Sequence, residues 1–435
     1  MKYTIYFLLS LFLFVNPIDL FSQFDVSGQF RTRAELGNGY KSLPTETNDP
    51  GFFISQRTRL NFNYSFEKIK TRFSIYDVRV WGDEDVYNKS GFWAKDSSSL
   101  DIYEAWVEFK IFKNSRIRIG KQELKYDDQR LISWRNWSQY GLSYDALLYS
   151  FKNKNLQADV VLSFNNKSAN SIRKEYYTNN NRMKTMNFVY IKKKFTKNMQ
   201  LSLIGLANGY EKEGNASIIY LTETMGGNFT YKNKLVNATA TAYYQMGENA
   251  TGQEVNAFLI AGKVFGNYNN FTFGGGFDLY SGHDAKNTDE DYIKIDHTFD
   301  NFFGARFSVN GNMNQITLID VHTKNGGLTD LYGRIQYAIN KKSTVRADLH
   351  ILSLTNDVLN TVSGEYYDKA LSKEIDLLFI HKFNKTVKLN LGFCYSLPSE
   401  TFENFKGVYV ENQDAINPYW SYLMLTVNPT FFTSK

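Results

Sequence analysis

The stretch RIRIGKQELKYDDQRLISWRNW spans residues 116–137 and begins with arginine at every second position. In an extended strand, successive side chains point to opposite faces, so Arg116 and Arg118 share one face while Ile117 and Ile119 share the other. A soluble sheet would bury the apolar face in a core. The alternative is a strand whose apolar face meets lipid and whose charged face lines a water-filled lumen. The rest of the sequence favours this second arrangement.

The composition excludes several classes of protein. The 435 residues include 35 Phe and 30 Tyr but only 6 Pro, and 22% are charged. This chain is too aromatic to be disordered and too polar on average to be built from membrane helices. A membrane β-barrel fits both observations, because alternating residues average out the hydropathy. The net charge of +6 comes from residues spread along the chain, so nucleic acid is not an expected partner.

The first residues have the pattern of a secretory signal peptide. Lys2 is followed by the apolar run IYFLLSLFLFV at 5–15, which is too short for a helix that spans a membrane. We therefore expect a signal peptide over 1–23 and a barrel over 24–435, with a retained anchor helix as the alternative. The single cysteine, Cys394, excludes an intrachain disulfide, which is compatible with a bacterial envelope protein.

Short polar turns and long polar loops alternate along the chain. FKNSRI (112–117) and FNKTVKL (383–389) are typical of the tight turns, whereas 211–221 and 282–327 are two of the expected long loops. This alternation predicts an all-β fold, a transmembrane antiparallel up-and-down β-barrel with short periplasmic turns and long outer loops. Eighteen strands are expected, which places both termini in the periplasm. The expected strands begin at Phe24, Phe52, Thr71, Leu100, Ser115, Gly141, Asn155, Lys184, Asn198, Thr222, Leu235, Glu254, Asn269, Leu328, Ser343, Ser372, Thr386 and Pro418.

A lumen of this width cannot be filled by side chains of the wall alone, so an aqueous channel is expected. Arginines of the first five strands fall on the predicted lumen face, where carboxylates such as Glu35, Glu104 and Glu108 accompany them. Two interpretations remain open: a salt-bridged ladder that stiffens the wall, or guanidinium groups that bind a passing anion. The arginines of this stripe are Arg31, Arg33, Arg57, Arg59, Arg72, Arg116 and Arg118.

The longest expected loop, 282–327, either folds into the lumen as a constriction or forms an external cap. Two acidic clusters, at 83–85 and 289–291, lack the alternating spacing of a calcium loop. The five histidines show no metal-ligand spacing, and no nucleophile or phosphate-binding motif occurs. The sequence therefore predicts no metal site, no cofactor and no enzymatic activity.

The quoted stretch, together with SYDALLYSF (143–151), resembles the signature of the alginate export family of outer-membrane barrels. YDVRVWGDED (76–85) is similar to a second block of that family. The resemblance implies an eighteen-stranded porin-like channel. The type member of the family exports an acidic polysaccharide through an arginine-lined pore. Lys121 stands where the family usually has arginine. The positions that the resemblance implies for solute contact are Arg79, Arg118, Lys121, Gln122, Glu123, Arg130 and Arg135.

The sequence thus predicts a passive channel in the outer membrane of a bacterial cell for hydrophilic, anionic solutes or an acidic polysaccharide. Its expected partners are outer-membrane lipid, the solute and periplasmic export proteins. A surface adhesin or display barrel whose long loops carry the function is the main alternative. A barrel hydrolase is less favoured, because no histidine has an evident serine partner.

Overall fold

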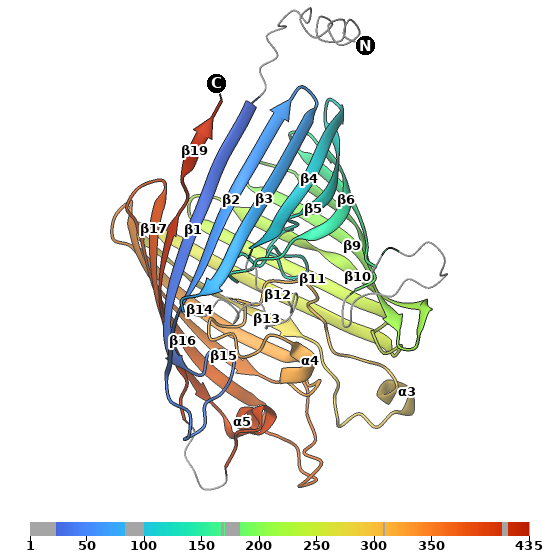
Figure 1. Cartoon of the computed structure of the whole chain (residues 1–435). Coiled ribbons are helices and arrows are strands. Elements are labelled where there is room, and N and C mark those ends of the chain that lie inside the picture. The colour runs from blue at the N-terminus through green and yellow to red at the C-terminus, as the bar shows by residue number, and fades with distance from the viewer. Residues whose placement is uncertain are drawn as a thin grey trace, which may run out of the picture.

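The structure is a computed structural model whose described residues form a closed barrel of antiparallel strands, shown in Figure 1. The described residues are 23–82, 100–166, 169, 183–307, 309–410 and 416–434. The expected signal peptide, except its last residue, and the acidic cluster at 83–85 lie outside them. Among the described residues, no helix has the length and apolar character needed to cross a membrane.

The strands follow one another around the barrel in chain order. They are β1 (Gln23–Asn38), β2 (Gly51–Phe66), β3 (Ile69–Val80), β4 (Leu100–Phe112), β5 (Ser115–Gln122), β6 (Tyr144–Lys152), β7 (Leu156–Phe164), β8 (Thr185–Lys194), β9 (Met199–Lys212), β10 (Asn215–Lys232), β11 (Val236–Glu248), β12 (Glu254–Tyr268), β13 (Phe271–Tyr280), β14 (Leu328–Ala338), β15 (Ser343–Ser353), β16 (Ala370–Lys382), β17 (Val387–Pro398), β18 (Tyr419–Val427) and β19 (Thr430–Thr433). Three short helices lie in the long loops: α3 (Glu290–Ile293), α4 (Ile319–His322) and α5 (Glu400–Lys406).

The barrel closes where β1 pairs with β2 on one side and with β18 and β19 on the other. Pro429 has no N–H to donate and separates β18 from β19. These two segments are consecutive parts of one strand position, so nineteen segments give eighteen strands around the wall. The predicted fold class and strand number are therefore confirmed.

The strand positions agree closely with the sequence prediction, with one clear exception. β10 begins at Asn215 rather than at Thr222, so β9 and β10 continue past the expected loop at 211–221 and meet at the two-residue turn 213–214. The predicted long loop at this place is wrong. Gly214, with φ +76°, allows the tight turn, and the hairpin shifts its register between Asn215 and Ile219.

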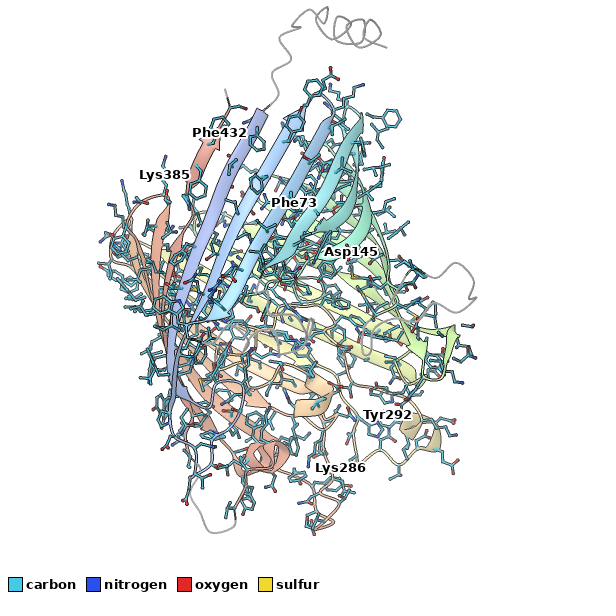
Figure 2. All side chains as sticks on the ribbon, in the orientation of Figure 1. Phe73, Asp145, Lys286, Tyr292, Lys385 and Phe432 are labelled. Carbon is cyan, nitrogen blue, oxygen red and sulfur yellow. The ribbon has the colours of Figure 1, made fainter. Side chains whose placement is uncertain are left out.

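The outer face of the wall is apolar, as the quoted stretch predicts. Ile119 on β5 is 46% exposed, whereas Arg118 next to it turns inward and donates to Glu108 on β4. Figure 2 labels Phe73 and Phe432, both exposed, on this outer wall. Closure of the barrel gives the backbone groups of the strands their hydrogen-bond partners. The band of exposed apolar side chains then presents hydrocarbon to lipid.

The two ends of the barrel differ. β1 begins and β19 ends at the rim that carries the short turns, whereas α3, α4 and α5 lie at the opposite rim (Figure 1). Lys385 marks the short-turn rim and Lys286 the long-loop rim in Figure 2. This arrangement agrees with the predicted periplasmic side for the short turns.

A charge at the middle of the outer face tests the lipid contact. Ile260 lies near the centre of β12 and is 46% exposed. We expect Ile260→Arg to lower the free energy of unfolding of the vesicle-embedded barrel by roughly 2–4 kcal/mol. Ile260→Leu, the matched control, should change it by less than about 1.5 kcal/mol. Urea titration of vesicle-folded protein measures both, and equal stabilities would contradict a lipid-facing position.

Candidate lumenal site

Two long loops enter the lumen and meet there. They are the β5–β6 loop (123–143) and the β13–β14 loop (281–327). Ser133 donates its backbone N–H to the carbonyl of Phe303 at 3.1 Å, and the rings of Trp137 and Phe307 stack with 3.6 Å between centroids. Apolar residues of both loops join inward-facing strand residues in one buried cluster. Both loops therefore occupy part of the lumen and pack there against side chains of the wall.

The β13–β14 loop is fixed to the inner wall at two places. Gln245 on β11 donates its amide to the carbonyl of Asp300 at 2.8 Å and accepts the Asp300 N–H at 2.9 Å. On β16, Glu374 accepts the N–H of Met313 at 2.7 Å. Of the two alternatives left open for this loop, the structure supports the one in which part of it constricts the lumen.

Arginines of the cationic stripe hold the β5–β6 loop in place. Arg31 donates to the carbonyls of Asn136 at 2.6 Å and Ser138 at 2.8 Å, and Arg57 donates to the carbonyl of Gln139 at 3.2 Å. Both arginines are almost fully buried. A guanidinium group has five donors in a rigid fork, which suits it to collect several main-chain carbonyls at once. These two residues therefore position the loop.

The family resemblance implies solute contact for Arg130 and Arg135, but Arg130 clamps the β5–β6 loop to the wall and Arg135 clamps it to the β13–β14 loop. Arg130 binds both carboxylate oxygens of Asp278 on β13, at 2.7 and 2.8 Å, and is 7% exposed. Arg135 donates to the carbonyls of Phe302 and Gly304 at 2.9 Å each. Burial lowers the pKa of Arg135 to about 10, so it remains protonated at neutral pH.

Arg59 differs from these clamps, because it has unused donors. Its nearest carboxylate, Glu123, lies 3.7 Å away, and its guanidinium carbon lies 3.5 Å from the ring centroid of Tyr103. Its Nε and Nη2 are buried without a hydrogen-bond partner. It lines a cavity of about 340 Å³ together with Arg72 and Asn61. Burial raises the pKa of Glu123, with the neighbouring Glu104 adding to the shift.

The remaining arginines of the stripe pair with carboxylates on the same wall. Arg33 bonds Glu35 at 2.7 Å and Arg72 bonds Glu104 at 2.5 Å. Arg116 and Arg118 both approach Glu108, at 3.2 and 2.7 Å. These contacts form the expected salt-bridged ladder along part of the wall, and at Glu108 two arginines share a single carboxylate.

Two of the predicted pore-lining residues lie on the other face of the wall. Arg79 stands opposite Gln56 and forms an ion pair with Asp77 at 2.8 Å, on the outward face of β3. Lys121 stands opposite Asp145 on the outward face of β5. The strand register therefore corrects the prediction for both residues, which lie an odd number of positions from Arg72 and Arg118. Gln122 faces inward but donates to the main-chain carbonyl of Ala146.

Sequence reasoning missed a basic cavity at the short-turn rim. The cavity measures about 820 Å³, and no acidic residue of the described chain lines it. Lys382 and Lys388 face each other across β16 and β17 on the inward face, an arrangement that costs energy unless an anion lies between the charges. The lysines that recur in the short turns are the feature of the sequence that could have predicted this cavity. The basic residues of this vestibule are Arg31, Lys341, Lys342, Lys382, Lys385 and Lys388.

The opposite rim is acidic. A cavity of about 790 Å³ there is lined by several carboxylates and by Lys212. Burial raises the pKa of Asp300 from its ordinary 3.8 to about 6; the N–H of Phe302 opposes this shift and the nearby Asp320 adds to it. The acidic residues of this cavity are Glu211, Glu213, Asp296, Asp300 and Asp320.

Comparisons with known proteins agree with this architecture. The family model for alginate export matches residues 22–208, which confirms the resemblance over that part of the chain. No curated protein matches the chain in sequence.

Solved structures with the same fold cover nearly the whole chain. OccAB4 of Acinetobacter baumannii has a TM-score of 0.62 at 11% identity, over 96% of this chain and 100% of that one. OpdL of Pseudomonas aeruginosa has 0.61 at 10%, over 94% and 99%. OpdK of the same organism, in complex with vanillate, has 0.59 at 9%, over 94% and 99%. OpdK is an outer-membrane protein, and this chain has the same barrel fold as these structures.

The Arg130–Asp278 pair should be essential for holding the β5–β6 loop. We expect Arg130→Met to destabilise the barrel by roughly 3–5 kcal/mol, because Asp278 would keep a buried charge without its partner. Arg130→Met combined with Asp278→Leu should recover most of that loss. Urea titration of vesicle-folded protein measures both. A double variant as unstable as the single one would argue against the unpaired charge as the cause.

Docking of the β13–β14 loop should weaken as the pH rises from about 4 to about 7. Because the pKa of Asp300 is about 6 in the folded protein and 3.8 ordinarily, the docked state binds the extra proton and is favoured at low pH. Hydrogen exchange of residues 299–307, corrected for intrinsic rates, should therefore slow at pH 5 relative to pH 7. Asp300→Asn keeps an oxygen for the Phe302 N–H and should abolish this difference. A difference that persists in the variant would point to another group.

Proposed function

We propose that the protein is a passive outer-membrane channel that conducts hydrophilic anions, with carboxylates as the favoured class. The observation that supports this proposal is a basic vestibule next to an inner cavity that contains two arginines. The basic vestibule at the short-turn rim and the cavity beside Arg59 share Gln29, Asn136 and Asn428 in their linings. An anion in the vestibule therefore lies next to a second cavity, which Arg59 and Arg72 line together with Glu123.

The charge of the vestibule supports anion entry from the periplasmic side. Six basic residues and no acidic residue of the described chain line it, whereas carboxylates dominate the cavity at the outer rim. A pore wall of one sign concentrates counter-ions and raises their rate of entry. The asymmetry favours capture of anions on the periplasmic side.

Arg59 is the residue that we assign to direct solute contact. Arg59 lines the inner cavity, and a guanidinium group suits bidentate binding of a carboxylate. Arg116 and Arg118, which share Glu108, are secondary contact candidates. Four other arginines shape the passage through the loops that they hold, namely Arg31, Arg57, Arg130 and Arg135. Vanillate, the ligand in the OpdK structure, is a small aromatic carboxylate, and an acidic polysaccharide would present the same group repeatedly.

The display alternative has less support. It needs long loops that project outward, whereas residues 299–307 pack against the β5–β6 loop inside the barrel.

Ion selectivity in planar bilayers tests the proposal. Arg59→Gln, and separately the pair Lys382→Gln and Lys388→Gln, should lower the anion-to-cation permeability ratio at least twofold in reversal-potential measurements. Lys121→Gln is the matched control, because it removes the same charge from the outward face of the wall. We expect it to leave the ratio unchanged. An unaltered ratio in both lumen variants, or an equal change in the control, would reject the cationic pathway.

The size of the solute is tested separately. Vanillate and a polyuronate are added in turn to the periplasmic side of the wild-type channel. Flux of vanillate without lasting block indicates a channel for small carboxylates. Long current blocks by the polyuronate that shorten in Arg59→Gln indicate passage of an acidic polymer.

A further inference from the structure

Two carboxylates on the inward face of β16 lack a cationic partner. Glu374 and Asp376 are each 1% exposed. Within the described part of the chain, neither forms an ion pair. They accept the backbone N–H groups of Met313, at 2.7 Å, and Asn312, at 3.1 Å. The two carboxyl groups also interact with each other, and the thiol of Cys394 interacts with Asp376. A buried carboxylate is costly without a counter-charge, so the two residues need a partner of opposite charge or a shared proton.

The neighbouring residues on the inner wall do not supply this charge. On β15, opposite β16, Asp348 is already bound by Arg334 and Arg346, and His350 is bound to Asp330. Four carboxylates therefore face two arginines and one histidine. Even with the histidine protonated, 4 − 3 leaves one negative charge in excess.

The loop segment that hydrogen-bonds the two carboxylates carries side-chain oxygens and no charged residue. Asn310, Asn312 and Asn314 alternate along the segment NGNMN (310–314), and each is at most 6% exposed. The side-chain oxygen of each has no hydrogen-bond partner, and the same is true of Glu374 Oε2 and Asp376 Oδ1. Five unsatisfied buried oxygens in two segments that are hydrogen-bonded to each other need an explanation, since such groups are normally paired.

We propose that Glu374, Asp376 and the asparagine oxygens of 310–314 bind one hard divalent cation of the Ca²⁺ class. Such cations take carboxylate and amide oxygens, and ligands at every second residue are the pattern of calcium-binding loops. Two carboxylates match the charge of the ion. Carboxylate and amide oxygens are hard ligands, which suit Ca²⁺ or Mg²⁺ rather than a soft metal.

Gly311 fits this arrangement. A Cβ atom at this position would overlap the carboxylate of Glu374, and the φ of +84° favours glycine. The segment can therefore approach the carboxylates only with glycine at its second position. A bound cation would cross-link the β13–β14 loop to β16 and hold the constriction inside the lumen.

Calorimetric titration tests the site on the full mature chain. The chain is refolded in detergent from inclusion bodies, so that no lipopolysaccharide is present, and stripped with chelator. Titration with CaCl₂ should show one bound ion per chain and a rise in the thermal midpoint. Glu374→Gln with Asp376→Asn should abolish both, and Asn312→Ala should weaken binding at least fivefold.

The matched control is Glu290→Gln with Asp291→Asn, two exposed acidic residues of α3 in the same loop. We expect this control to bind Ca²⁺ as the wild type does. No binding by the wild type would overturn the proposal, as would binding lost in the control. If the carboxylates instead share a proton, Ca²⁺ will not raise the thermal midpoint at any pH. If the double carboxylate variant fails to fold, Asn312→Ala decides the outcome. The selectivity measurements above do not depend on this ion, so the two proposals can fail separately.

Discussion

The structure depends on one constraint, that backbone N–H and C=O groups facing hydrocarbon must find their partners within the protein. The closed pairing of β1 with β2 and with β18 meets it, because no strand edge remains open. Once closure is imposed, the sequence can place apolar residues on every outward position. The inward positions are then free to carry charge, and this freedom is what allows arginine and glutamate to dominate the first strands.

Closure with eighteen strands creates a second requirement, because the interior is too wide for the wall to fill. The two inserted loops satisfy it, and their irregular backbone needs donors and acceptors at a depth where water is scarce. Arg31, Arg57 and Arg135 supply donors to loop carbonyls, and Gln245 and Glu374 supply acceptors to loop N–H groups. Under the proposed function, the same cationic groups that shape the passage would also attract anions, so stability and selectivity would share residues.

The period-two pattern made the strands, their faces and their number predictable, because lipid and water impose opposite demands on alternate residues. The family motif implied solute contact for Arg79 and Lys121, but their odd spacing from Arg72 and Arg118 places both on the outward face of the wall. The partners of Arg130 could not be predicted, since Asp278 lies 148 residues away and only the folded loop brings the two together. The oxygen cluster around Glu374 was equally hidden, because its two halves come from segments that are about sixty residues apart.

The seam between the first and last strands has a consequence for assembly. Asp25 pairs with Thr433, so the two ends of a chain of more than four hundred residues must find each other before the cylinder exists. Contacts this distant in sequence form slowly, because the entropy of closing the intervening loop is lost first. Until then β1 presents a bare edge that could capture a strand of another molecule. The nascent sheet is therefore most vulnerable to mispairing at this seam, and the interval before closure is when it most needs protection.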